Sequence, residues 1–342
     1  MRKSLANNAV TAKARAVYGK FLTKDDYISL LHKGSISAAV AYLKTKPLYE
    51  AIFADTAELS IHREQAEQLI NQNVFDNYLR LCRYASGDKK GIMSFHVKQA
   101  ECEQLSKAVI AVISGTQEGY LRSFPEYMSE HFCFDPLGLA AAKKLPDIAA
   151  AIKGTMYSRP LDPLLNDPSP DINRIVTMIN VCYIKWAFEQ TDKTEKGRTR
   201  ELLKEFILHK TDADNLLMCY RMKKTFSADS AGISELLIPY HRRLRVKDIQ
   251  DALKMPDPVS ALKELFVKVR AAAPEDLAIP EVGVNIADYR YFRHRLAVST
   301  GETESLYSLM MLLRAESVNL CRIIEGLRYG LPPEETEKYL II

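Results

Sequence analysis

The polar residues best suited to chemistry in this sequence form one pattern that occurs three times: an acid, two intervening residues, an amide and a leucine. The three copies place Glu101 with Gln104, Asp212 with Asn215, and Glu316 with Asn319. An acid and an amide three positions apart lie on the same face of a helix. Such a pair could transfer protons or could form hydrogen bonds to a neighbouring helix. Because no nucleophile or set of metal ligands accompanies the motif, the pattern favours hydrogen bonds between helices, with contact to a partner protein as the alternative.

Two further segments, 240–245 and 290–295, mix arginine and histidine with aromatic residues. Three interpretations are open: a solvated helix face, a surface that docks onto an acidic partner, and a phosphate clamp with stacking platforms for nucleic acid. A net charge of +4 and a pI near 8.5 are too low for a nucleic-acid module, so none is predicted as a partner. The residues predicted to bind a partner protein are Arg242, Arg243, Arg245, Arg290, Arg293, Arg295 and Arg322.

The familiar motifs of catalysis and cofactor binding are missing from the sequence. It contains no GxxxxGK[ST] loop for phosphates, no GxGxxG, no GxSxG, no HExxH and no EF-hand loop. His131 and Cys133 could supply half of a metal site, but no second local pair completes the four ligands of a structural zinc. The sequence therefore predicts no catalytic residue, no cofactor and no metal.

Composition is that of an ordinary globular chain of 342 residues, with 47% hydrophobic and 26% charged residues. Six cysteines are scattered without a CxxC pair, which predicts buried reduced thiols. The longest apolar run, 108–113, is far shorter than the roughly 20 residues that span a bilayer. The first residues also lack the apolar core of a signal peptide. We therefore expect a cytoplasmic location, with any membrane contact made through another protein.

Helical periodicity dominates the chain. Between 172 and 186, apolar residues recur at steps of three and four, which is typical of one buried helix face. Helices are likewise expected over 61–85, 97–113, 199–225, 246–254, 258–272 and 302–327. Loops are expected at 159–171, which holds four prolines, and at 87–91, 192–197 and 274–283. The prediction is an all-α fold.

Internal repetition gives the domain organisation. Residues 22–43 and 244–265 share a pattern of apolar and acidic positions at a constant offset of 222, and a fainter middle copy is predicted near Glu126. Together with the three acid–amide motifs, this predicts three diverged helical repeats of about 105 residues, longer than the units of solenoid arrays. The predicted boundaries are 1–115, 116–235 and 236–342. We expect the repeats to close into a ring or funnel with approximate threefold symmetry.

Segments at both ends of the chain resemble a known family. Residues 12–16 and 21–31 look like the N-terminal region of the C subunit of V/A-type (vacuolar/archaeal-type) ATPases, a family that includes the d subunit of eukaryotic V-ATPases. The segment 316–326, followed by Gly330 and by residues 334–340, is similar to the C-terminal signature of that family. Length, helical content and triplication extend the resemblance over the whole chain, and it is weakest between 100 and 200.

The resemblance implies a funnel of three helical repeats without an active site. Its open end would receive the central shaft of the catalytic head, and its other face would sit on the cytoplasmic loops of the membrane proteolipid ring. The protein would be peripheral to the membrane on its cytoplasmic side and would transmit torque for proton or sodium transport. The alternatives are a generic helical-repeat scaffold or adaptor, or an RNA-directed enzyme that uses the arginine- and histidine-rich segments.

Overall fold

The computed structural model describes residues 2–56, 61–85, 89–268 and 279–342, and it contains helices and turns but no strand in those ranges. The all-α prediction is therefore confirmed. The long predicted helices appear as α5 (Arg63–Cys82), α6 (Lys89–Ser114), α11 (Ile172–Thr194), α12 (Gly197–Phe226) and α17 (Glu302–Tyr329). The short break expected at 192–197 lies between α11 and α12. Of the turn predicted at 87–91, residues 87 and 88 lie outside the described residues, but 89–91 already belong to α6, so that part of the prediction is wrong. Of the break predicted at 274–283, residues 274–278 lie outside the described residues, and the last part is wrong because α16 begins at Pro280.

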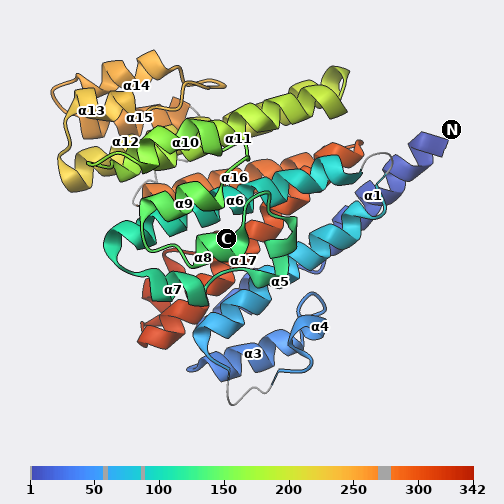
Figure 1. Cartoon of the computed structure of the whole chain (residues 1–342). Helices are drawn as coiled ribbons and strands as arrows, with labels where there is room; N and C mark the ends of the chain where they lie inside the picture. The colour runs from blue at the N-terminus through green and yellow to red at the C-terminus, as the bar shows by residue number, and fades with distance from the viewer. Residues whose placement is uncertain (1, 57–60, 86–88, 269–278) are drawn as a thin grey trace. The chain divides into compact units, whose positions relative to one another are not determined.

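The order of helices recurs along the chain (Figure 1). After α1 (Arg2–Tyr18), a group of three or more short helices precedes a pair of long ones three times among the described residues. The remaining helices are α2 (Lys24–Leu31), α3 (Ile36–Lys44), α4 (Glu50–Phe53), α7 (Gln117–Arg122), η2 (Glu126–His131), α8 (Pro136–Ala140), α9 (Leu145–Ala151), α10 (Ser158–Leu165), α13 (Ser230–Glu235), α14 (Val246–Leu253), α15 (Pro258–Lys268), α16 (Pro280–Val298) and α18 (Pro333–Glu337). The predicted repeat boundaries and the funnel stay predictions.

The chain packs as two compact units, of which unit 1 combines Met1–Met93 with Glu275–Ile342. Its centre is α17, which packs against α1, α5 and α16. Helix α17 carries buried apolar side chains on most of its faces, as expected for a helix that is surrounded by other helices. The N-terminal helix is tied to α16 by Arg15, whose guanidinium donates to the carbonyls of Leu296, Ala297 and Ser299 at 2.8–3.1 Å. Those carbonyls end a helix and lack partners within it.

Two glycines explain how α17 ends. Gly330 has φ of 63° and lets the helix stop in the left-handed conformation. At Gly326, a Cβ would lie 2.4 Å from Oγ1 of Thr336. Glycine at this position therefore allows α18 to pack directly on the backbone of α17.

Unit 2 comprises Ser94–Pro274, in which α11 packs beside α10 and α12, and α12 packs beside α15. Asp171 begins α11 by accepting from the backbone N–H groups of Asn173 and Arg174. Asp171 is therefore the N-terminal cap of α11.

The loop predicted at 159–171 is wrong in its first half, because α10 runs through Pro160 and Pro163. Pro160 lies in the first turn, where a backbone N–H has no partner within the helix in any case. Pro163 removes one hydrogen bond, and the helix ends soon after it at Leu165.

Candidate functional site: the acid and amide motifs

All six motif residues lie on buried faces of the second long helix of each pair. Glu101 and Gln104 are on α6, Asp212 and Asn215 on α12, and Glu316 and Asn319 on α17. Each side chain is at most 5% exposed. A buried carboxylate needs a partner because desolvation disfavours its charge. The three acids find partners in three different ways.

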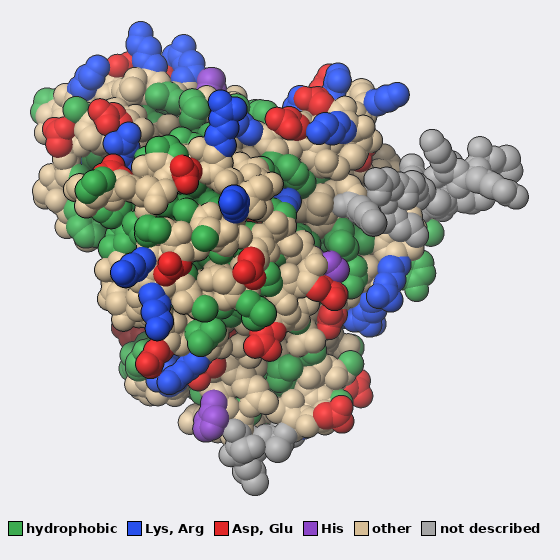
Figure 2. All heavy atoms as spheres, in the orientation of Figure 1, with side chains coloured by type: hydrophobic (Ala, Val, Ile, Leu, Met, Phe, Trp, Pro, Cys, Tyr) green, Lys and Arg blue, Asp and Glu red, His purple; other side chains and the backbone are tan. Residues whose placement is uncertain are grey.

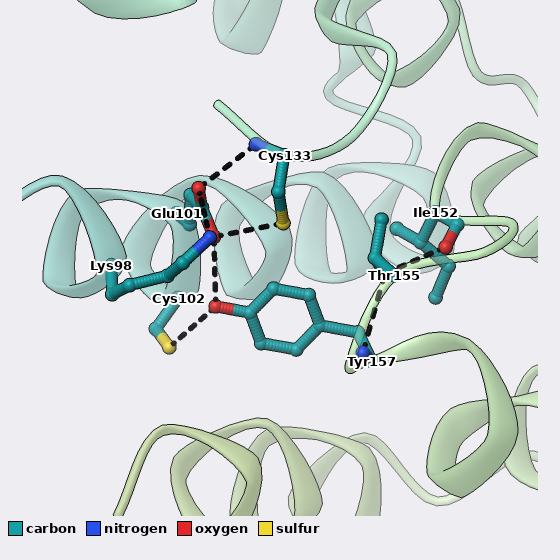
Figure 3. Close-up of polar contacts among 7 residues, drawn as sticks. All are labelled: Lys98, Glu101, Cys102, Cys133, Ile152, Thr155 and Tyr157. Atoms are coloured by element: carbon teal, nitrogen blue, oxygen red, sulfur yellow. Dashed lines mark hydrogen bonds and ion pairs between the residues drawn. The ribbon is translucent and has the colours of Figure 1, made fainter. Parts of the chain in front are cut away.

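Glu101 is held by side chains (Figure 3). Lys98 Nζ lies 2.8 Å from both carboxylate oxygens, and the Tyr157 hydroxyl donates to Oε2 at 3.1 Å. Cys133 donates to the same carboxylate through its backbone N–H at 2.9 Å and its thiol at 3.2 Å. Tyr157 also lies 3.5 Å from the thiol of Cys102.

The thiols beside Glu101 are poorly suited to nucleophilic chemistry. Cys133 is an exposed residue, so the expectation that all the cysteines are buried is wrong for it, but local desolvation of its sulfur and the negative charge of Glu101 still raise the pKa of its thiol to about 11. Burial also raises the pKa of Cys102. A thiol reacts as its thiolate, so both sulfur atoms are held in the unreactive form at neutral pH. This cluster therefore links α6 to the segments around Cys133 and Tyr157.

Asp212 is held by the backbone. Its Oδ1 accepts from the N–H of Arg242 at 3.0 Å, and its Oδ2 accepts from those of Arg243 at 2.7 Å and Leu244 at 3.2 Å. Consecutive N–H groups that converge on one carboxylate form an anion-binding turn. The turn lies immediately before α14, so Asp212 fixes where that helix begins relative to α12.

Glu316 is held by a backbone N–H group and by tyrosine hydroxyls. The backbone N–H of Leu22 donates to Oε2 at 3.1 Å, and the Tyr49 hydroxyl donates to Oε1 at 2.6 Å. Burial raises the pKa of Glu316 to about 8, although the hydrogen bonds from Tyr49, Leu22 and Tyr27 act in the opposite direction. Glu316 therefore changes protonation near neutral pH.

The amides of the second and third motifs clasp a backbone segment. Asn215 Nδ2 donates to the carbonyl of Ile238 at 2.9 Å, and the N–H of Ile238 returns a bond to Oδ1 at 2.9 Å. Asn319 does the same with Ile341, at 2.8 and 2.7 Å. Gln104 departs from this pattern, since its buried Oε1 accepts no hydrogen bond from the described residues.

Several arginines of the two mixed segments form ion pairs with carboxylates. Arg242 binds Glu205 on α12, and Arg245 binds Asp248 at 2.9 Å. Arg295 binds Glu304 between α16 and α17. Arg290 and Arg293 are exposed on α16.

Two more predicted binding residues complete this set. Arg243 is exposed next to the Asp212 turn. Arg322 donates to the carbonyl of Tyr339, and burial lowers the pKa of its guanidinium.

Sequence reasoning missed most partners of the motif acids. Lys98, three positions before Glu101 on the same helix, could have been found from its spacing. Tyr49, Tyr157 and the backbone of Leu22 carry no local signal, because they lie 56 to 294 positions from the acids they bind. His131 lies near Glu130, and no group of three or more potential metal ligands occurs in the described part of the chain.

Comparison with known proteins places this arrangement in a family. The family described as ATP synthase (C/AC39) subunit matches residues 10–339, which is nearly the whole chain. The chain belongs to the ATP synthase (C/AC39) subunit family. Membership of the C/AC39 family confirms the resemblance expected from the two ends of the sequence.

Two curated relatives carry the same type of name. The C subunit of the A-type ATP synthase of Methanosarcina mazei is 23% identical over a 354-residue alignment that covers 100% of this chain and 94% of that protein. The C subunit of the A-type ATP synthase of Methanosphaera stadtmanae is 24% identical over 218 residues, covering 62% of this chain and 53% of that protein. Among the described residues of this C/AC39 protein, no helix is both long and apolar enough to cross a membrane.

Proposed function

We propose that this C/AC39 protein is a coupling subunit, without an active site of its own, in a rotary A/V-type ATPase or ATP synthase. In this role it joins the central shaft of the catalytic head to the membrane proteolipid ring and transmits torque between them. It would lie at the cytoplasmic face of the membrane. The observation that carries the proposal is the family match over residues 10–339, together with the names of the two relatives.

The bonding of the motif residues supports a mechanical role. A part that transmits torque must resist shear between its helices, and close packing supplies much of that stiffness. The acids and the two asparagines add hydrogen bonds that join long helices to segments 22 to 294 positions away. Most of these bonds involve a charged group, and such bonds are stronger than those between neutral groups.

The surface supports contact with partners through many dispersed charges. In Figure 2, Lys and Arg side chains lie among Asp and Glu over α13–α15. On α16, Arg290 and Arg293 are exposed residues about one helical turn apart. Guanidinium groups bind carboxylates through paired hydrogen bonds, so these two residues suit an acidic protein partner.

Co-purification tests the proposed function. A tagged chain, expressed in its own cells and purified gently, should bring down the shaft subunits, the head subunits and the proteolipids. Complexes that lack it should hydrolyse ATP without moving ions. Purified alone, it should show no stoichiometric binding of Mg-ATP in calorimetry. Recovery of the chain with neither shaft nor proteolipid subunits would contradict the proposal.

A further inference from the structure

The segment that follows α17, residues 330–342, turns back and runs antiparallel along that helix. Three contacts fix it there, each between a residue of α17 and one of the segment: Gly326 with Thr336, Arg322 with the carbonyl of Tyr339, and Asn319 with the backbone of Ile341. As the segment proceeds, its contacts move towards the start of α17. The segment therefore has an inner face against the helix and an outer face.

The outer face exposes large apolar side chains. The inner side chains are buried, and they are Thr336, Leu340 and Ile341. On the outer face Tyr339 is 47% exposed, and Tyr329 and Leu331, at the turn that begins the segment, are 62% and 48% exposed. The carbonyl of Tyr339 is bound by Arg322, which lies about 10 Å along α17 from Tyr329. Two tyrosines and a leucine are therefore exposed within a short distance of one another.

In the second motif the equivalent segment is covered by the chain itself. Asn215 clasps Ile238 there, so Leu236, two positions earlier, takes the place of Tyr339. Leu236 is 5% exposed, and its carbonyl accepts from the Thr177 hydroxyl of α11 at 3.3 Å. The same position is thus buried in one copy and half-exposed in the other, which is how a surface completed by a second molecule would differ from one completed internally.

The charges beside the exposed tyrosines are mainly acidic. The segment carries three exposed acids and one base: Glu334, Glu335, Glu337 and Lys338. Lys338 binds Glu335 at 2.6 Å, and Arg328 lies over the ring of Tyr329 at 5.6 Å. Acids therefore outnumber bases by two between 330 and 342. An anionic lipid or a nucleic acid would be repelled by such a surface, whereas a cationic protein segment would be attracted to it.

We propose that the outer face of residues 329–339 is a docking surface for a partner protein that presents an apolar side chain flanked by lysine or arginine. Tyr329, Leu331 and Tyr339 bury apolar area against the partner, and tyrosine is enriched among the residues that dominate binding energy. Glu334 and Glu337 pair with the partner's cations. The proposal is set by the chemistry of this surface and does not depend on the proposed role in a rotary ATPase.

Site-specific photo-cross-linking tests the surface. Benzoylphenylalanine replaces Tyr339 in one full-length chain and Leu331 in another, and each chain is expressed in its own cells and purified gently with its partners. Irradiation should cross-link both chains to the same partner protein. Mass spectrometry should place both adducts in one segment that has an apolar residue and more lysine and arginine than acid. No adduct, or adducts only on lipid, on an acidic segment or on the chain itself, would overturn the proposal.

Charge reversal tests the role of the acids. Glu334→Lys with Glu337→Lys should lower the yield of the Tyr339-site adduct at least about threefold at low salt, and less at high salt. Glu118→Lys with Glu130→Lys is the matched control, because it changes the net charge equally at exposed acids of unit 2. Circular dichroism checks that both double variants keep their helices.

The two double variants separate this proposal from the proposed function. Equal adduct yields in both variants would overturn the role of Glu334 and Glu337. Adducts on a cationic segment of a protein outside any ATPase would support the docking surface and contradict the proposed function. Co-purification with shaft and proteolipid subunits without any adduct at either position would support the proposed function and overturn the docking surface.

Discussion

Asp212→Ala should be among the most damaging single substitutions in unit 2, because it removes one acceptor from three backbone donors. The N–H of Leu244 is buried and would be left without a partner, at about 1–3 kcal/mol. Those of Arg242 and Arg243 are only partly buried and can reach water, so each should cost about 0.5–1.5 kcal/mol. The expected loss of unfolding free energy is therefore about 2–6 kcal/mol.

Urea unfolding followed by tryptophan fluorescence measures this loss. The chain has a single tryptophan, Trp186 on α11. It packs against Phe95 with ring centroids 5.2 Å apart, and both residues belong to unit 2, as Asp212 does. The signal therefore reports the unit that contains the substitution, which avoids treating the unfolding of both units as one two-state transition.

Asp214→Ala is the matched control. Asp214 is on the same helix, two positions on, and its side chain is 46% exposed and pairs with Lys210 at 3.2 Å. An exposed pair of this kind contributes about 0–1 kcal/mol. The two alanine variants should therefore differ by at least about 1 kcal/mol. If Asp212→Ala loses no more than Asp214→Ala, the backbone donors do not depend on Asp212, and the account of the motif as a cross-link is refuted.

Three other perturbations probe different parts of the structure. The wild-type melting temperature should fall between about pH 5 and pH 8, because folding raises the pKa of Glu316 from its ordinary 4.5 to about 8. The stabilisation contributed by protonated Glu316 is complete below the unfolded-state pKa and is lost as the pH rises towards the folded-state pKa. Calorimetry on Glu316→Gln should give a melting temperature that depends less on pH, and a pH dependence equal to that of the wild type would contradict the prediction. Gly326→Ala should lower the free energy of unfolding by about 1–3 kcal/mol, because the new Cβ would contact the Thr336 side chain. Adding Thr336→Ala should restore much of that free energy in a urea titration, and a double variant no more stable than Gly326→Ala would contradict this explanation. Arg290→Glu with Arg293→Glu should weaken assembly onto the shaft or ring at low salt, and a pull-down in which the double variant matches the wild type would identify both arginines as a solvated face.

The long helices could be predicted from sequence because each carries its own apolar period. The apolar stripe from Ile172 to Trp186 begins at the residue where α11 begins. The buried acids and amides could be singled out, since a polar pair on one helix face is visible locally. Their partners could not, because nothing near Glu316 in the sequence points to Leu22 or Tyr49. Pro160 and Pro163 led to the wrong prediction of a loop over 159–165, because proline is compatible with the first turn of a helix and does not prevent a short helix from forming.

The clasp formed by the two asparagines shows how an all-helical chain satisfies the backbone of a segment that lies outside its helices. A side-chain amide offers one donor and one acceptor in the arrangement of a peptide group, so Asn215 and Asn319 each act as a one-residue substitute for a neighbouring strand. An aspartate could not donate and a leucine could do neither. The stretch between asparagine and isoleucine is 23 positions in one case and 22 in the other, yet the bonds are the same. A change of one residue would rotate a continuous helix by about 100°. The asparagine clasp tolerates a change of one residue in the length of the connecting segment. Connectors of this kind can therefore gain or lose residues while the helices that they join keep their positions.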